Sequence, residues 1–75
     1  MQRVSVVAKL TAKSGLENRV EKELLEMVEK TRQETGCINY DLHRSLDCPQ
    51  TFVFYENWVS KGCLDLHFET PHLTR

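Results

Sequence analysis

The residues that could carry out chemistry gather in the last third of this 75-residue sequence. His67 and His72 lie there together with Trp58, the only tryptophan, and all three phenylalanines fall between positions 52 and 68. An imidazole titrates near neutral pH and can take a proton from a phenolic hydroxyl. Flat aromatic side chains can enclose a planar ring, although such side chains also serve as ordinary core residues. The cluster therefore points either to a site for an aromatic substrate or to a ring-rich core.

The neighbours of each histidine in the sequence indicate which way its side chain faces. His67 shares a helical flank with Leu64 and Phe68 in LDLHF, so we expect it to face the sheet instead of water. A histidine on an apolar face can be a hydrogen-bonded core residue as well as a catalytic base. His72 follows Pro71, outside the helical pattern, where it either covers the mouth of a pocket or lies on the plain surface. Both alternatives stay open for each residue.

A metal centre is not predicted by the spacing of possible ligands. Cys63, His67 and His72 come closest, but zinc normally takes four ligands and these supply at most three, with a proline between the two histidines. We therefore expect no metal ion and no cofactor. The other cysteines, Cys37 and Cys48, form no CxxC pair with Cys63, so all three are expected to be reduced thiols.

The elements that position these residues follow from hydrophobic periodicity. Residues 3–11 alternate apolar and polar positions, as a half-buried strand does. Apolar residues then recur at helical spacing and predict a helix over 15–34, with Ser14 and Glu17 as a capping box. Gly36 stands where a left-handed residue would end this helix.

Two more strands and a second helix are predicted after Gly36. Alternation over 37–45 and the aromatic and β-branched run over 51–58 predict two strands, joined as a hairpin by a turn that contains Pro49. Ser60 can cap a second helix over 61–69. The order β-α-β-β-α is typical of an α+β, ferredoxin-like sandwich whose closing strand is missing, and residues 1–75 are expected to form a single domain.

Composition narrows the classes of partner. A net charge of −1 and a pI near 6.3 create no field that would draw nucleic acid, and no run of about 18 apolar residues predicts a membrane span. We expect a cytoplasmic protein. A domain of this size buries only about 60% of the surface of its unfolded chain, so its core is expected to need a partner.

Three stretches carry a resemblance to a known family. VVAKLTAKSG, ETGCINYDLHRSLDCPQTFVFYENW and SKGCLDLHFETPHL, in this order and at this spacing, resemble the antibiotic biosynthesis monooxygenase (ABM) family, which includes quinol monooxygenases. The resemblance covers nearly the whole chain. It implies a ferredoxin-like sandwich that dimerises through its sheets into an α+β barrel, with His67 lining a pocket between sheet and helices. Members continue through a closing strand beyond the position of Arg75, so we expect either a truncated chain or a sheet edge completed by a partner.

The function that the resemblance implies is a cofactor-independent monooxygenase. Its substrates would be molecular oxygen and a hydroquinone or polyphenol-like aromatic molecule, and its partner a second copy in a homodimer. His67 would be catalytic and would handle the substrate proton. The residues expected to bind the substrate are Trp58, Tyr40 and Phe54 around the ring, His72 or Asn39 on an oxygen, and His43. Asn39 and His43 share the polar side of their strand and could equally form a subunit contact, and Tyr40 could be core.

Other functions remain open at this stage. Family relatives that isomerise or degrade a small phosphorylated signalling molecule would need basic residues at the pocket, for which only Arg44, Lys61 and Arg75 are candidates. Haem-degrading relatives use an asparagine on the first strand and a tryptophan on the second helix. Here the first strand has no asparagine and the helix carries His67, so haem degradation is disfavoured. A non-catalytic dimeric binding module of the same fold is the alternative outside the enzymes. Glu56 is expected to be a buried carboxylate held by a hydrogen bond.

Overall fold

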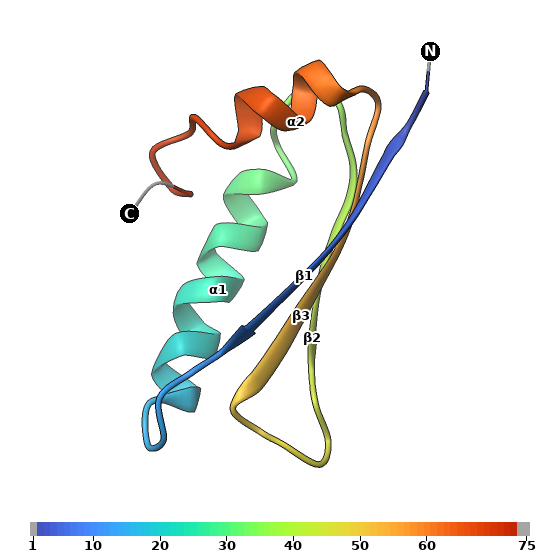
Figure 1. The fold of residues 1–75 in the computed structure, drawn as a ribbon. Helices are drawn as coiled ribbons and strands as arrows, with labels where there is room; N and C mark the ends of the chain where they lie inside the picture. The colour runs from blue at the N-terminus through green and yellow to red at the C-terminus, as the bar shows by residue number, and fades with distance from the viewer. Residues whose placement is uncertain (1, 74–75) are drawn as a thin grey trace.

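An antiparallel sheet with β3 at its centre forms the base of the structure, a computed structural model that describes residues 2–73 (Figure 1). β3 (Thr51–Trp58) pairs with β1 (Val4–Thr11) on one side and with β2 (Cys37–Arg44) on the other. Two helices, α1 (Glu17–Thr31) and α2 (Lys61–His67), complete the order β1-α1-β2-β3-α2. Because both outer strands run antiparallel to β3, α1 crosses between two parallel strands in next-but-one positions. The predicted α+β, ferredoxin-like β-α-β-β-α arrangement is confirmed.

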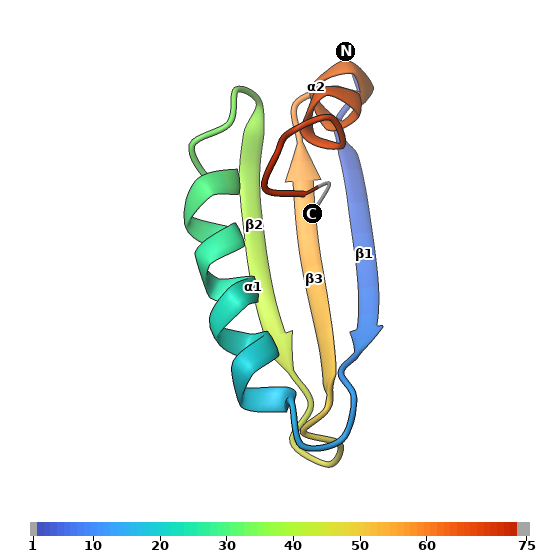
Figure 2. The ribbon, with the colours of Figure 1, turned by 90° about the vertical axis from the view of Figure 1, so that its left-hand side faces the viewer.

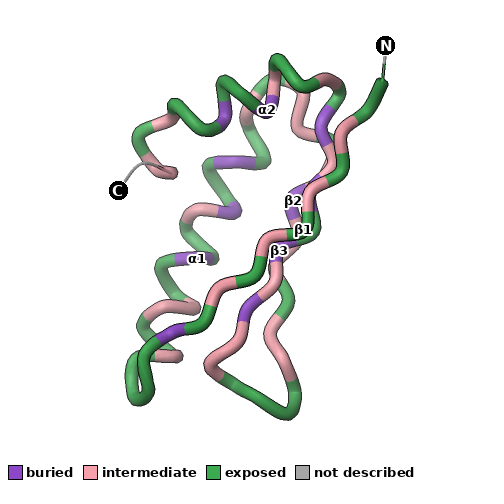
Figure 3. Tube along the Cα trace, in the orientation of Figure 1, coloured by how far each residue is buried: buried purple, intermediate pink, exposed green. Residues whose placement is uncertain are grey.

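The two helices cover one face of the sheet. In Figure 2, α1 runs alongside β2, and α2 lies across the end where β3 finishes and β1 begins. Figure 3 shows buried stretches on both helices and on the strands. The core lies on the helix-covered face, and in it Phe52 and Trp58 have no exposed surface. On the opposite face the exposed side chains include Val7 and Tyr55, which oppose each other in the β1–β3 register. No helix within residues 2–73 is long and apolar enough to cross a membrane.

The start of α1 differs from the prediction. The capping box of Ser14 and Glu17 is wrong: Leu16 is the N-cap residue and makes no side-chain capping bond. Gly15 has a φ of +88°, and the Leu16 amide donates to the Lys13 carbonyl at 3.0 Å. This turn separates Ser14 from the helix, and a polar residue followed by glutamate three positions later was not enough to predict it.

The end of α1 also comes earlier than predicted. The helix stops at Thr31, so Gly36 is not its terminating residue, although Gly36 does adopt a positive φ of +84°. The intervening residues 32–36 form a tight turn in which the Glu34 amide donates to the Thr31 carbonyl and the Cys37 amide to the Glu34 carbonyl. This turn places the Glu34 side chain beside α2, where the site is built.

α2 packs closely against that turn. Ser60 caps it as predicted, accepting a hydrogen bond from the Cys63 amide at 3.3 Å. Leu64 and His67 are buried against the sheet, but the expectation that Phe68 lies with them is wrong, since Phe68 is 53% exposed. The helix ends at His67 after seven residues, two residues earlier than the predicted end at position 69.

Candidate functional site

His67 occupies the centre of the candidate site. Its side chain is 1% exposed and comes from the last turn of α2. The imidazole lies 4.7 Å from the Trp58 ring and 5.4 Å from the Tyr40 ring, centroid to centroid. The prediction that His67 turns toward the sheet is confirmed, and the surrounding rings leave its orientation little freedom.

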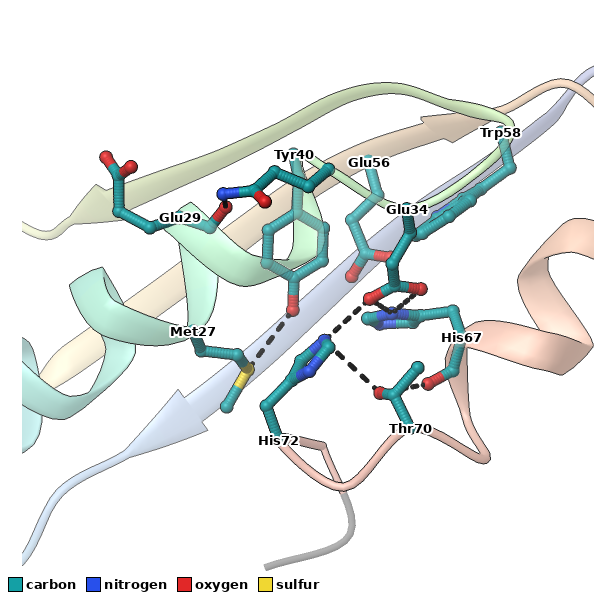
Figure 4. Close-up of polar contacts among 10 residues, drawn as sticks. Met27, Glu29, Glu34, Tyr40, Glu56, Trp58, His67, Thr70 and His72 are labelled. Carbon is teal, nitrogen blue, oxygen red and sulfur yellow. Dashed lines mark hydrogen bonds and ion pairs between the residues drawn. The ribbon is translucent and has the colours of Figure 1, made fainter.

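The Glu34 carboxylate, which the sequence analysis did not select, holds the orientation of the His67 imidazole. Both oxygens of Glu34 lie within hydrogen-bond distance of His67 Nδ1, at 3.1 and 3.0 Å (Figure 4). A carboxylate can only accept, so His67 Nδ1 carries the proton and donates it to Glu34. The other ring nitrogen, Nε2, is then the one left for a substrate proton. A buried histidine oriented by a carboxylate is the arrangement of a general base.

His72 joins the same carboxylate from the segment after α2. Its Nε2 lies 2.6 Å from Glu34 Oε2 and 3.2 Å from Thr70 Oγ1. The Thr70 hydroxyl in turn donates to the His67 carbonyl at 2.7 Å. These bonds fold residues 70–72 back over the end of α2, as Figure 4 shows. His72 therefore lies beside His67, with their ring centroids 6.3 Å apart.

Tyr40 forms the floor beneath the two histidines. The residue is 2% exposed, its ring lies 4.8 Å from that of Phe54, and its hydroxyl donates to Met27 Sδ at 3.5 Å. Burial raises the pKa of the Tyr40 phenol, and the nearby Glu56 carboxylate raises it further. The hydroxyl is therefore a hydrogen-bond donor at neutral pH.

Trp58 and Glu56 form a buried polar pair below His67. The indole Nε1–H of Trp58 donates to Glu56 Oε1 at 3.0 Å, and the two residues are 0% and 4% exposed. The expectation that Glu56 is buried and held by a hydrogen bond is confirmed. Because Trp58 is enclosed on all sides, it acts as a core residue that supports the imidazole.

Five of the seven predicted site residues thus come together: His67, His72, Tyr40, Phe54 and Trp58. The other two do not. Asn39 and His43 lie on the opposite face of the sheet, because alternate residues of a strand point to opposite sides. There Asn39 donates to Asp41 and to the Tyr55 carbonyl, and His43 is exposed opposite Val53.

A pocket of about 370 Å³ opens beside the cluster. It is lined by α1 and by His72, the one predicted site residue that reaches it, with the full lining formed by Val20, Glu23, Leu24, Glu26, Met27, Lys30 and His72. Met27 stands between this pocket and the Tyr40 hydroxyl. Of the two alternatives that the sequence left open, pocket wall or core, the rings of Tyr40, Phe54 and Trp58 take the second, since all three are buried and none lines this pocket.

The basic residues that the sequence offered for a phosphorylated substrate lie elsewhere, although another basic residue, Lys30, lines the pocket. Arg44 pairs with Glu21 at 3.4 Å and donates to the Pro49 carbonyl at 2.6 Å, near the β2–β3 turn. Lys61 pairs with Asp65 on the exposed side of α2. The third candidate, Arg75, lies outside the described residues. No contact in the described part of the chain brings Arg44 or Lys61 to the histidines.

Comparison with known proteins identifies the family. The family model described as Antibiotic biosynthesis monooxygenase matches residues 3–75. The protein Rv0793 of Mycobacterium tuberculosis, provisionally named a monooxygenase, is 33% identical over 69 residues, which is 92% of this chain and 67% of Rv0793. The Synechocystis protein sll1783 is 38% identical over 45 residues, 60% of this chain, and the match spans only 31% of that relative.

Solved structures show the same fold. PA3566 of Pseudomonas aeruginosa superimposes with a TM-score of 0.94 at 32% identity, over 100% of this chain and 76% of that one. The Rv0793 structure gives 0.89 at 32% identity, over 97% and 74%. A crystal structure described as an antibiotic biosynthesis monooxygenase gives 0.91 at 39% identity, over 99% and 77%. The chain spans roughly three quarters of each of these structures.

Proposed function

The chain belongs to the antibiotic biosynthesis monooxygenase family, and we propose that it oxygenates a hydroquinone or a similar polyphenol without a cofactor. The observation that carries the proposal is the Glu34–His67 pair, a carboxylate 3.0 Å from Nδ1 of a buried imidazole. This pair can remove a proton from a phenolic hydroxyl, which is the step that such a substrate needs from the protein.

The chemistry balances without a further reductant. A deprotonated hydroquinone is electron-rich enough to reduce oxygen itself. One atom of molecular oxygen enters the ring, which becomes a hydroxyquinone, and the other atom leaves as water. All four electrons come from the substrate. The protein is required only to bind the ring, accept the proton and keep water away from the reacting atoms.

Each residue of the cluster has a role in this scheme. Glu34 holds His67 with Nε2 free to take the proton and stabilises the imidazolium that forms. His72, on the wall of the pocket, donates its Nε2–H to Glu34, so its Nδ1 can accept a hydrogen bond from a substrate hydroxyl. The pocket volume of about 370 Å³ lies within the ~300–1,000 Å³ that is usual for small-molecule sites. Met27 is unbranched, so its rotation can admit a flat ring from the pocket toward Tyr40 and His67.

Oxygen consumption tests the proposal. The purified chain, freed of metal with a chelator, is given a panel of hydroquinones in an oxygen electrode. We expect uptake by the wild type, and a loss of about 10²–10⁴-fold in His67→Gln, because a positioned general base contributes that much. Glu34→Gln should fall as well, whereas Glu29→Gln, at an exposed position of α1, should keep the wild-type rate. No uptake with any hydroquinone, or full activity in a folded His67→Gln variant, would refute it.

One observation favours a second function. Tyr40, Trp58 and His67 are all nearly or wholly buried, so the rings form no open cavity in a single chain. A dimeric module that binds its ligand at the α1 pocket without turning it over would fit this packing. Such a module would show saturable binding of a hydroquinone by calorimetry together with no oxygen uptake.

A further inference from the structure

Three metal-binding side chains from three separate segments converge at the candidate site. Glu34 comes from the turn after α1, His67 from the end of α2 and His72 from the segment beyond it. Each offers one donor atom, and these atoms all lie within 4.8 Å of one another. Cys63, which the sequence pattern had grouped with the two histidines, is not among them. The third possible ligand is therefore the Glu34 carboxylate and not the Cys63 thiol.

The donor set suits a transition metal. Two imidazole nitrogens and one carboxylate oxygen are a common ligand set for catalytic zinc, which keeps its fourth position for water. With metal–ligand bonds of about 2.0–2.2 Å, tetrahedral coordination separates its donors by about 3.3 Å. Glu34 Oε2 already lies 3.0 Å from His67 Nδ1 and 2.6 Å from His72 Nε2. The donor atoms of His67 and His72 lie within 4.8 Å of each other, so the partly exposed His72 side chain has to move toward His67 for one ion to replace the two protons.

The surroundings favour a defined site over a chance meeting of polar groups. His67 is held by the Trp58 and Tyr40 rings, and the Thr70 hydroxyl donates to the His67 carbonyl, which keeps the segment that carries His72 close to the end of α2. Such outer contacts orient metal ligands. The Glu34 and His72 side chains are 15% and 14% exposed, which leaves an entry path, and His72 also lines the α1 pocket, from which water can reach a fourth position.

We propose that Glu34, His67 and His72 form a binding site for a divalent transition-metal ion of the zinc class. A bound ion joins the turn at 32–36, the end of α2 and the segment at 70–72 through one centre. A metal ion binds to the deprotonated nitrogen of an imidazole, so it takes the place of a proton at each histidine. The site goes beyond the proposed oxygenation, in which the same side chains act without a metal.

Titration with Co²⁺ and Zn²⁺ tests the site on the full chain without substrate. We expect one ion per chain by calorimetry, visible d–d bands of tetrahedral Co²⁺, and a higher melting temperature with Zn²⁺. Glu34→Gln and His72→Gln should each weaken binding at least tenfold and abolish the thermal shift. The matched controls are Glu29→Gln and His43→Gln, at exposed positions outside the cluster, and both should bind as the wild type does.

Several outcomes would overturn the proposal. These are no binding of either ion by the wild type, unchanged affinity in both Glu34→Gln and His72→Gln, or loss of binding in His43→Gln. A sulfur-to-cobalt charge-transfer band in the near ultraviolet would assign the ion to a cysteine instead. Far-UV circular dichroism establishes that each variant is folded. The oxygen assay contains a chelator and therefore tests oxygenation without metal. The titration contains no hydroquinone and therefore tests metal binding alone. A negative result in one experiment does not decide the other.

Discussion

Two glycines share a left-handed backbone but differ in their surroundings, and this difference yields a sharp prediction for Gly36→Ala. Gly15 and Gly36 have φ values of +88° and +84°. An added Cβ at Gly15 meets nothing within 4 Å, whereas one at Gly36 collides with the Cys63 side chain, whose own Cβ lies 2.7 Å away. The loss of stability in Gly15→Ala therefore measures only the cost of a left-handed backbone at alanine. The loss in Gly36→Ala measures that cost together with the cost of the clash with Cys63.

The magnitudes separate the two variants. A non-glycine residue in the left-handed region costs about 1–2 kcal/mol, and both variants bear this cost. Overpacking of a filled site adds about 1–3 kcal/mol, and only Gly36→Ala bears it. Because Cys63 belongs to α2 and Gly36 to the turn that carries Glu34, relief of the collision must move the helix and the turn apart. Gly36→Ala should therefore be the less stable variant by about 1–3 kcal/mol.

Urea denaturation under reducing conditions measures this difference. With a slope of about 1 kcal/mol per molar urea for a chain of this size, the unfolding midpoint of Gly36→Ala should lie about 1–3 M below that of Gly15→Ala. Adding Cys63→Ala to Gly36→Ala removes the sulfur but leaves the Cβ, so it should restore only part of the loss. Equal free energies of unfolding for the two glycine variants would refute the close packing of α2 on the turn.

Further predictions concern the buried groups. Trp58→Phe removes the indole donor to the buried Glu56 carboxylate and should lower the free energy of unfolding by about 1.5–3 kcal/mol in urea; a loss within 0.5 kcal/mol would contradict the bond. Because burial raises the pKa of Tyr40 in the folded state, its contribution to stability is complete below about pH 10 and falls as the pH rises above it. Tyr40→Phe should flatten this alkaline loss, and an unchanged pH profile would count against it. Burial and the Glu34 charge raise the pKa of Cys37, so a thiol reagent at neutral pH should modify exposed Cys48 first, and Cys48→Ser should remove the fast phase.

The strands were predictable because their signal is local. Alternation placed β1 and β2 within one residue at each end, and β3 at its observed bounds. Alternation also places Ile38 on the same side of β2 as the buried Tyr40, yet Ile38 is 43% exposed, next to a shift of the β2–β3 register between Cys37 and Asn39. An irregularity in pairing depends on the neighbouring strand, and no pattern within β2 alone reveals it.

The ends of the helices were less predictable than the strands, and for this reason Glu34 was missed as a site residue. Residues 32–34 were predicted to continue the helix, yet they belong to the turn that carries Glu34. Arg32 helps to hold that turn by donating to the Tyr40 carbonyl and to Asp41 on β2. A glutamate at the end of an amphipathic helix is usually a solvated charge, so its sequence context gave no reason to select it.

The partners of Glu34 lie 33 and 38 residues away in the chain. The sequence could place His67 on the buried flank of α2, since that follows from helical spacing. Whether a buried imidazole is a core residue, a base or a metal ligand is decided by what its nitrogens face, and here Nδ1 faces the carboxylate of Glu34, which a turn brings to it. The contact of Gly36 with Cys63 holds that turn against α2. The chemistry of His67 therefore rests on the packing of a glycine that touches neither the imidazole nor any substrate.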